Sequence, residues 1–350
     1  MNIEKKGEGK VRVVILMMMM VMMMGCNSGG NDPEKVFLSE MVNLGKGFLD
    51  VFVSFGDMIT GTLGIKADTK KSEIGGYFTK IAETMKEVRG KLGKILEKNG
   101  HYAKVKEKVG EFITTIDKIE EGAKTAAGGI SGDDKISAAS AAGQDAAPAD
   151  KDSVNFLVNG IKTIVAVVLR ANEGDATATK TADTEKKSVG KLFSGTNAAD
   201  GTDAHAAAAS ASIGAVSGAD ILQAIAKSAN AADNEIQIVN AKNAAEIAAA
   251  KKENAGTEFN VDDVKKDAVI AAGIALRAMS KGGKFAAKNE DKSAHAVNGV
   301  AASAVTKVLN TLIISIRNTV DSGLKEVNEV LATIKQEDKA SANVAASGQQ

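Results

Sequence analysis

The chain has few of the residues on which disulfide-stabilised and β-sheet proteins depend. Its 350 residues include no tryptophan, two tyrosines, two prolines and one cysteine, and aromatic residues make up 3%. A single cysteine excludes an internal disulfide. Because β-sheets favour branched and aromatic side chains, an aromatic-poor chain rich in alanine points to closely packed helices. Only Pro33 and Pro148 could interrupt a helix through the proline ring.

The charges of the chain balance, which removes the usual reason to expect nucleic acid as a partner. Basic and acidic residues number 44 each. Residues 1–25 hold four of the basic and two of the acidic side chains, so the remainder carries 40 basic and 42 acidic residues. A nearly neutral chain of this kind offers no electrostatic attraction to a phosphate backbone.

The N-terminus has the pattern of a bacterial lipoprotein signal. Residues 1–12 are polar and basic, and Val13–Met24 is an apolar run too short to span a bilayer as a helix. Gly25 and Cys26 follow at once. This pattern predicts cleavage before Cys26 and a lipid on its thiol. A plain secretory signal with an incidental cysteine is the alternative, and Met23-Met24 departs from the usual residues of the motif.

Three segments in the first third of the chain carry large apolar residues at alternating steps of three and four. The first segment follows Asp32-Pro33, which reads as a helix start. A repeat of 3.5 residues gives each helix one apolar seam, and consecutive seams joined by short turns predict antiparallel helices. The three seams are Phe37, Met41, Leu44, Phe48, Val51, Phe55 and Met58; Ile74, Phe78, Ile81, Met85, Val88, Leu92 and Ile95; and Tyr102, Val105, Val109, Phe112, Ile116 and Ile119.

The middle of the chain is poorer in large apolar residues. Residues 122–150 and 172–212 are of low complexity, and much of the second stretch is expected to be loop. Between them, Val154–Arg170 is apolar nearly all round and predicts a buried helix, with a strand over Thr163–Leu169 as the alternative.

Further helices are expected toward the C-terminus. They are Ser217–Ala229, an alanine-rich helix from about Asp233 to Glu253, a helix capped by Asp262 or Asp263 that runs to Lys281, and a long last helix from about Asp291 to Gln336. The seam of the last helix is Val305, Leu309, Leu312, Ile316, Val320, Leu324, Val327, Leu331 and Ile334.

We therefore expect an all-α protein, an elongated antiparallel helical bundle with a membrane-distal cap of short helices and low-complexity loops. The expected parts are a signal peptide (1–25), a lipidated tether (26–33), one helical domain (34–337) and a disordered tail (338–350). Within the domain we expect a membrane-proximal stalk (34–121 and 291–337), a distal variable cap (122–260), and a buried helix with a loop (261–288). The cap is expected to bury little apolar surface, so its sequence could change at small cost.

A search for chemistry finds no catalytic arrangement, so no enzyme, cofactor or metal is expected. His101, His205 and His295 lie far apart in the sequence, and none has a partner at metal-ligand spacing. No phosphate-binding loop, zinc-protease motif or nucleophile elbow occurs. The acid pairs Asp133-Asp134 and Asp262-Asp263 are interpreted as capping and solvation, with metal binding as the less favoured alternative.

Lysine-rich stretches occur, but acids are interleaved with them. This pattern favours solvated helix faces with pairing along the helix, and a site for a glycosaminoglycan or host protein is the alternative. The stretches are Lys104, Lys106 and Lys108; Lys251-Lys252; and Lys265-Lys266.

Three stretches resemble a known family. They are Lys35–Gly64 (KVFLSEMVNLGKGFLDVFVSFGDMITGTLG), Lys70–Met85 (KKSEIGGYFTKIAETM) and Val264–Lys288 (VKKDAVIAAGIALRAMSKGGKFAAK). Together they resemble the variable large proteins of relapsing-fever Borrelia, and are similar to the antigenically varying surface lipoprotein of Lyme-disease spirochaetes. The likeness covers nearly all of residues 26–337.

The resemblance implies an outer-surface lipoprotein of the cell outer membrane whose alleles are exchanged to escape antibodies. Only the lipidated cysteine carries over from the family, onto Cys26. The partners expected are membrane lipid through the acylated Cys26 and host antibodies, and the chain is expected to be a monomer or weak homodimer. The alternative function is an adhesin that binds a host matrix protein or glycosaminoglycan.

Overall fold

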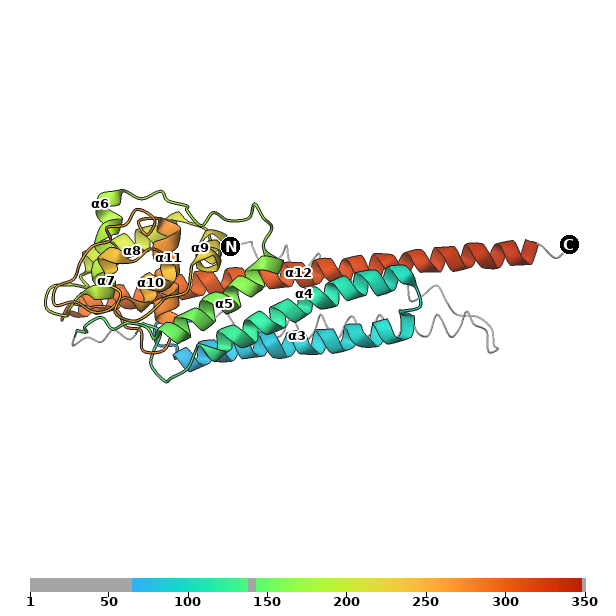
Figure 1. The fold of residues 1–350 in the computed structure, drawn as a ribbon, viewed down its shortest axis with the longest axis horizontal. Helices are drawn as coiled ribbons and strands as arrows, with labels where there is room; N and C mark the ends of the chain where they lie inside the picture. The colour runs from blue at the N-terminus through green and yellow to red at the C-terminus, as the bar shows by residue number, and fades with distance from the viewer. Residues whose placement is uncertain (1–64, 138–142, 348–350) are drawn as a thin grey trace, which may run out of the picture. The chain divides into compact units, whose positions relative to one another are not determined.

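The computed structural model describes residues 65–137 and 143–347, which fall in one compact unit spanning Asp57–Gln350. The signal peptide, the tether and the first predicted helix lie outside the described residues and stay predictions. Among the described residues the backbone is helical and forms no strand, only isolated β-bridges (Figure 1). The all-α prediction is therefore confirmed.

Two of the predicted seams form the helices α3 (Lys71–Asn99) and α4 (Ala103–Gly128), which pack against each other as an antiparallel pair (Figure 1). All seam positions of the second predicted helix are buried. In the third, the seam is buried from Val105 to Ile119, whereas Tyr102 is half-buried as the N-cap residue. The alternating three- and four-residue steps place these side chains on one stripe of each helix, and burying that stripe is what joins the pair.

The helix α5 (Lys151–Val168) packs on α4 at very short range, and the strand alternative for Thr163–Leu169 is wrong. The two helices meet at glycines. A Cβ atom on Gly122 would lie 2.6 Å from the carbonyl oxygen of Gly160, and one on Gly160 would lie 2.5 Å from the backbone nitrogen of Ala126. The backbones approach this closely only because neither glycine carries a side chain.

This crossing gives a testable prediction. Gly160→Ala should destabilise the protein by about 1–3 kcal/mol, because the added methyl group meets backbone atoms that can only move if the helices separate. Gly110→Ala is the matched control, since a Cβ at Gly110 meets nothing within 4 Å and alanine is a better helix former. Urea denaturation measures both, and an equal loss from the two changes would contradict the close crossing.

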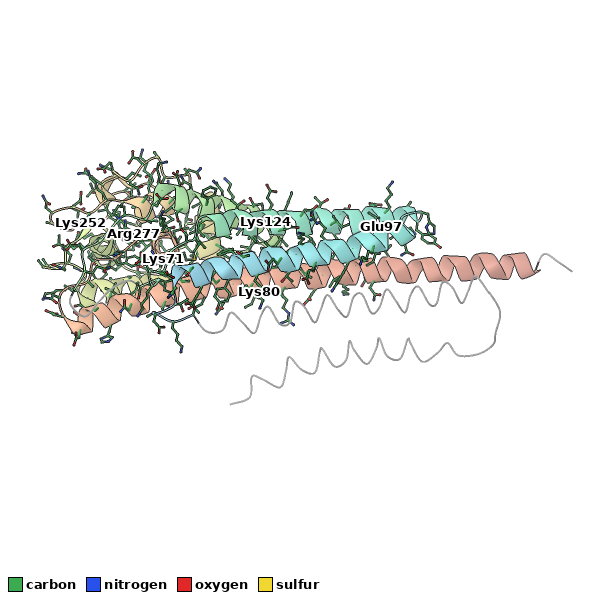
Figure 2. The ribbon with its side chains drawn as sticks, turned by 90° about the horizontal axis from the view of Figure 1, so that it is seen from below. Lys71, Lys80, Glu97, Lys124, Lys252 and Arg277 are labelled. Carbon is green, nitrogen blue, oxygen red and sulfur yellow. The ribbon has the colours of Figure 1, made fainter. Side chains whose placement is uncertain are left out.

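The short helices gather around the first part of the longest helix, α12 (Asp291–Ser347), as Figures 1 and 2 show. We call residues 171–290 the short-helix cluster. Its elements are α6 (Asp183–Lys186), η1 (Lys187–Val189), α7 (Gly190–Ser194), α8 (Asp203–Ala215), α9 (Gly218–Lys227), η2 (Ile238–Asn240), α10 (Ala244–Ala249) and α11 (Asp267–Met279).

The expectation that the cap buries little apolar surface is wrong. Val189, Leu192 and Phe193 are fully buried, and Ala206 and Ala209 of α8 are buried as well. The prediction that much of 172–212 is loop is confirmed for 172–182 and 195–202, whereas α6, η1, α7 and the start of α8 occupy the rest of the range. Alanine lets α8 pack closely on α11 and α12, so a count of large residues underestimates how much surface these helices bury.

The predicted alanine-rich helix Asp233–Glu253 is also wrong. The structure has only η2 and the single turn and a half of α10 in this range. Asn243 accepts hydrogen bonds from the backbone nitrogens of Ala245 and Glu246, which starts α10 late, and the Asn234 amide binds backbone groups at Ala149, Lys151 and Ala249. Side chains that bind backbone groups compete with the helix for them, and here they win.

Two helix boundaries differ from the sequence predictions. α11 begins at Asp267 after a run of turns, so Asp262 and Asp263 do not cap it. α12 begins at Asp291 as predicted but continues to Ser347, past Gln336, so most of the expected disordered tail is helical. The sequence explains the extension, because no glycine or proline occurs between Gly323 and Gly348 and the tail is rich in alanine.

The seam of α12 is buried as far as its side chains are described, from Val305 to Val327. At 1.5 Å per residue the helix is about 85 Å long. Its stretch Asp291–Val330 contains an 18-residue window apolar enough to cross a membrane, but 56% of that window is buried, which is typical of a core helix.

Candidate functional site

Cys26, the one predicted site residue, lies outside the described residues. The structure therefore does not test its lipidation, which stays a prediction from the N-terminal pattern.

The histidines and acid pairs do not converge on a reactive centre. His101 stacks on Tyr102 in the turn between α3 and α4, His205 is on α8, and His295 is on α12. The described part of the chain holds no group of three or more His, Cys, Asp or Glu side chains that could bind a metal ion. Burial lowers the pKa of His205, whose Nδ1 accepts a hydrogen bond from the backbone nitrogen of Thr202 (3.4 Å). Its role is to cap α8.

Members of the lysine-rich stretches pair with acids, but only Lys108 does so along a helix, as the interleaving predicts. Lys265 pairs within a turn, and Lys252 pairs with a residue 107 positions away. Lys108 contacts Glu111 at 2.7 Å, Lys252 contacts Asp145 at 2.9 Å, and Lys265 contacts Asp262 at 2.7 Å. Exposed pairs of this kind contribute little to stability. They also leave these lysines neutralised, which is a poor arrangement for an anionic glycan.

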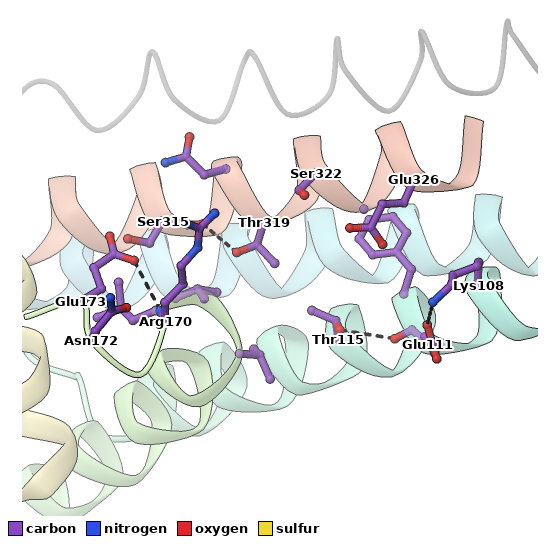
Figure 3. Close-up of a pocket in the computed structure, with 16 residues that line it drawn as sticks. Lys108, Glu111, Thr115, Arg170, Asn172, Glu173, Ser315, Thr319, Ser322 and Glu326 are labelled. Atoms are coloured by element: carbon purple, nitrogen blue, oxygen red, sulfur yellow. Dashed lines mark hydrogen bonds and ion pairs between the residues drawn. The ribbon is translucent and has the colours of Figure 1, made fainter. Parts of the chain in front are cut away.

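A trough of about 700 Å³ lies between α4, the end of α5 and α12 (Figure 3). Phe112 forms part of its lining and has room only because position 323 is glycine, where a Cβ would lie 2.2 Å from the ring. The hydroxyls of Thr115 and Thr319 donate to carbonyl oxygens of their own helices. The lining holds hydroxyl, carboxylate and lysine side chains but no histidine or cysteine.

The most exposed parts of the short-helix cluster are stretches of chain between helices. We call residues 171–185, 197–199, 229–242 and 252–263 the exposed segments, since most of their side chains face solvent. They come from distant parts of the sequence. The three longer segments share one feature, because each is held to α11 or its neighbours by hydrogen bonds between a polar side chain and backbone groups.

α11 is the centre of the cluster. It contacts α8, α9, α10 and α12, and all thirteen of its residues except Val269 are buried. A helix that is buried all round must satisfy each charged residue it carries with nearby polar groups. α11 carries two charged residues, Asp267 at its start and Arg277 near its end.

Arg277 is fully buried and donates only to backbone carbonyl oxygens among the described residues. Its Nε donates to Ala248 (2.9 Å), and Nη1 donates to Phe193 (2.6 Å) and more weakly to Lys284 (3.4 Å). Nη2 donates to Ile247 (3.2 Å) and Ala250. Three of these carbonyls belong to the last turn of α10 and its C-cap, where backbone acceptors outnumber the helical donors.

One further feature stabilises this buried charge, and burial itself acts against it. The Phe193 ring lies 4.9 Å from the guanidinium carbon and provides a cation–π contact. Burial lowers the pKa of Arg277 to about 9, which still leaves it charged at neutral pH.

Asp267 fastens an exposed segment to the other end of α11. Its carboxylate accepts hydrogen bonds from the backbone nitrogens of Lys180 (2.6 Å) and Thr181 (2.9 Å), and from the Thr181 hydroxyl (2.5 Å). Burial acts to raise the pKa of Asp267, but these hydrogen bonds outweigh it and lower the pKa overall.

Asp200 connects the exposed segment 252–263 to the loop after α7. Its carboxylate accepts hydrogen bonds from the backbone nitrogens of Thr196 (3.2 Å) and Gly256 (2.9 Å).

Sequence reasoning did not identify these anchors. In the sequence, Arg170 and Arg277 stand in the same triplet, Leu-Arg-Ala, within Val165–Gly174 and Gly273–Gly282, which indicates two similar helix ends. The structure separates them, since Arg170 is exposed and Arg277 is buried. The signal that was present is a lone arginine in an otherwise apolar helix, which demands buried acceptors.

Comparisons with known proteins agree on one group. The family profile described as Borrelia lipoprotein matches residues 48–331. The chain is 57% identical to variable large protein 4 of Borrelia hermsii, over 90% of this chain and 91% of that protein, and 55% identical to variable large protein 17, over 93% and 94%. The solved structure of the Lyme disease variable surface antigen VlsE of Borrelia burgdorferi matches with a TM-score of 0.72 and 37% identity. That match covers 85% of this chain and all of VlsE.

These similarities extend over nearly the whole of the described helices, and the fold of VlsE is shared as well as the sequence. The chain belongs to the Borrelia lipoprotein family, among the variable large proteins.

Proposed function

We propose that this chain is a surface antigen that is held to the outer membrane by a lipid on Cys26 and differs between alleles in its exposed segments. The observation that carries the proposal is its 57% identity to variable large protein 4 over 90% of the chain, together with the likeness to VlsE, a variable surface antigen of Borrelia burgdorferi.

The way α11 holds the exposed segments supports variation. Arg277, Asp267 and Asp200 reach the rest of the cluster largely through backbone nitrogens and carbonyls. Every residue type supplies a backbone carbonyl, and every residue except proline supplies a backbone N–H. A segment anchored in this way can change its exposed side chains without losing its anchors.

The tolerance is confined to exposed positions. Phe193 and Leu192 lie close in sequence to exposed residues such as Asn197, yet they are fully buried. Changes in the buried positions remove packing and cost stability, whereas exposed changes usually alter it by less than about 0.5 kcal/mol. Antibodies would meet the exposed residues, where variation costs least.

The lipid anchor is tested by Cys26→Ala. The change removes the thiol that would carry the lipid, and several acyl chains on one residue would make release from a membrane very slow, since each buried CH₂ contributes about 0.8 kcal/mol. We expect Cys26→Ala to accumulate as uncleaved or soluble protein, measured by membrane fractionation and by the mass of the N-terminal peptide. Cys26→Ala that fractionates with membranes like the natural chain would overturn the assignment.

A further inference from the structure

A second buried basic side chain lies where the bundle of α3, α4, α5 and α12 meets the short-helix cluster. Lys71 is the first residue of α3, and its side chain is completely buried. Its Nζ donates to the carbonyl oxygens of Ser280 (2.5 Å) and Gly283 (2.8 Å). These acceptors belong to the turn that follows α11, so a single side chain ties the start of the bundle to the centre of the cluster (Figure 2, where Lys71 and Arg277 are labelled).

The surroundings of Lys71 favour a neutral amine. The Nζ atom donates to two uncharged carbonyl groups. A neutral amine has two N–H donors, which these two acceptors match, whereas an ammonium has three. The charged groups that face it are Asp134 from the loop before α5, Arg277 from α11 and Lys284 from the segment after α11. Two of the three repel a positive charge at this place.

We propose that Lys71 is a pH-sensitive latch between α3 and the Ser280–Gly283 turn, which holds most firmly when the amine is neutral and loosens when it takes up a proton. Protonation leaves both hydrogen bonds in place. It adds a third N–H and a positive charge that is buried beside the guanidinium of Arg277, and release of the side chain to water relieves that cost.

The direction of the pH effect follows from the pKa. Burial lowers the pKa of Lys71 from 10.5 to about 7; Asp134 opposes this, and Arg277 and Lys284 reinforce it. Between pH 7 and 10.5 the released lysine binds a proton that the latched one does not, so the latched state gains stability as pH rises through this window. That gain is lost as pH falls toward 7, and little further change comes from Lys71 below it.

Other titrating groups can be kept apart from Lys71 by the choice of pH. His205, whose pKa burial lowers from 6.5, titrates below that value. Arg277 has a pKa of about 9, so it stays mostly charged up to pH 8.5. The interval from pH 7.0 to 8.5 therefore reports mainly on Lys71.

Hydrogen exchange on the full-length chain tests the latch at single backbone amides. The backbone N–H of Asp150 donates to the carbonyl of Lys281 (2.9 Å), and that of Lys284 donates to the carbonyl of Ala147 (3.0 Å). Both hydrogen bonds must open when the turn is released. After correction for the intrinsic effect of pH, their protection should be roughly fifteenfold greater at pH 8.5 than at pH 7.0. Amides in the middle of α4 serve as the internal control and should change little.

Two neighbouring substitutions separate the latch from general charge effects. Lys71→Met keeps the length of the side chain but cannot titrate, so protection of these amides should become nearly independent of pH. Lys70→Met removes an exposed lysine that pairs with Asp133 and should keep the natural pH dependence. The proposal is overturned if the natural chain shows equal protection at both pH values, a result that does not depend on either variant folding, or if Lys71→Met keeps the dependence.

Discussion

Leu312→Asp is expected to destabilise the protein by about 4 kcal/mol or more and to leave much of it unfolded. Leu312 lies in the seam of α12 and is fully buried. The new carboxylate would therefore be shut off from water among apolar side chains, without a cationic partner. Either it stays protonated in an apolar site or α12 separates from the helices that cover it. Circular dichroism during urea titration measures the loss.

The same helix provides the control two residues later. Ile314 is 57% exposed although it is apolar and helical like Leu312. Ile314→Asp should change the free energy of unfolding by less than about 0.5 kcal/mol, because its carboxylate stays in water. Similar losses from both variants would show that the apolar repeat of α12 does not define its buried face.

Arg277→Met has the second largest expected effect, a loss of about 3–5 kcal/mol. Methionine can fill much of the space but donates no hydrogen bonds, so the carbonyls of Phe193, Ile247 and Ala248 each lose a hydrogen bond inside the protein. Those of Ile247 and Ala248 keep one backbone donor each. Removing a desolvated charge offsets part of this loss, which is why the estimate is lower than the sum of the broken bonds. We expect the end of α10 to open first, visible as faster hydrogen exchange there.

Arg170→Met is the matched control because Arg170 occupies the same position in the other Leu-Arg-Ala triplet but is exposed. Its free energy of unfolding should stay within about 0.5 kcal/mol of the natural chain. If Arg277→Met were equally mild, the carbonyl bonds would not be what holds α10 in place.

The bundle could be predicted from sequence because its information is local. Each seam of α3, α4 and α12 repeats every 3.5 residues, and the period alone states which face is buried. Phe78 and Val88 illustrate this, since their spacing along one helix already places them on the covered stripe. The period did not give the end of α12, because the last residues of this helix have helical propensity without a seam.

The short-helix cluster could not be predicted in the same way because its order comes from contacts between distant residues. Asn234 binds backbone groups at Ala149 and Lys151, and Arg277 binds the carbonyl of Phe193, which lies 84 residues away. No periodic pattern encodes such pairs. Composition was also misleading, because alanine buries well at close range although it contributes little to a count of large apolar residues.

Function could be predicted from the sequence to the extent that it depends on the targeting signal and on the protein family. The basic head, the short apolar run and Cys26 predict a lipoprotein from physical pattern, and the family assignment rests on Val264–Lys288 and similar stretches. The anchors Asp267 and Arg277 lie inside that stretch, and their role became visible only with the structure.

Digestion of intact cells by an added protease tests the central claim of surface display most directly. The account predicts that the full-length chain disappears, with cleavage starting in the exposed segments, while a marker protein enclosed by the outer membrane stays whole. A chain that survives on intact cells and is cut only after lysis would contradict it.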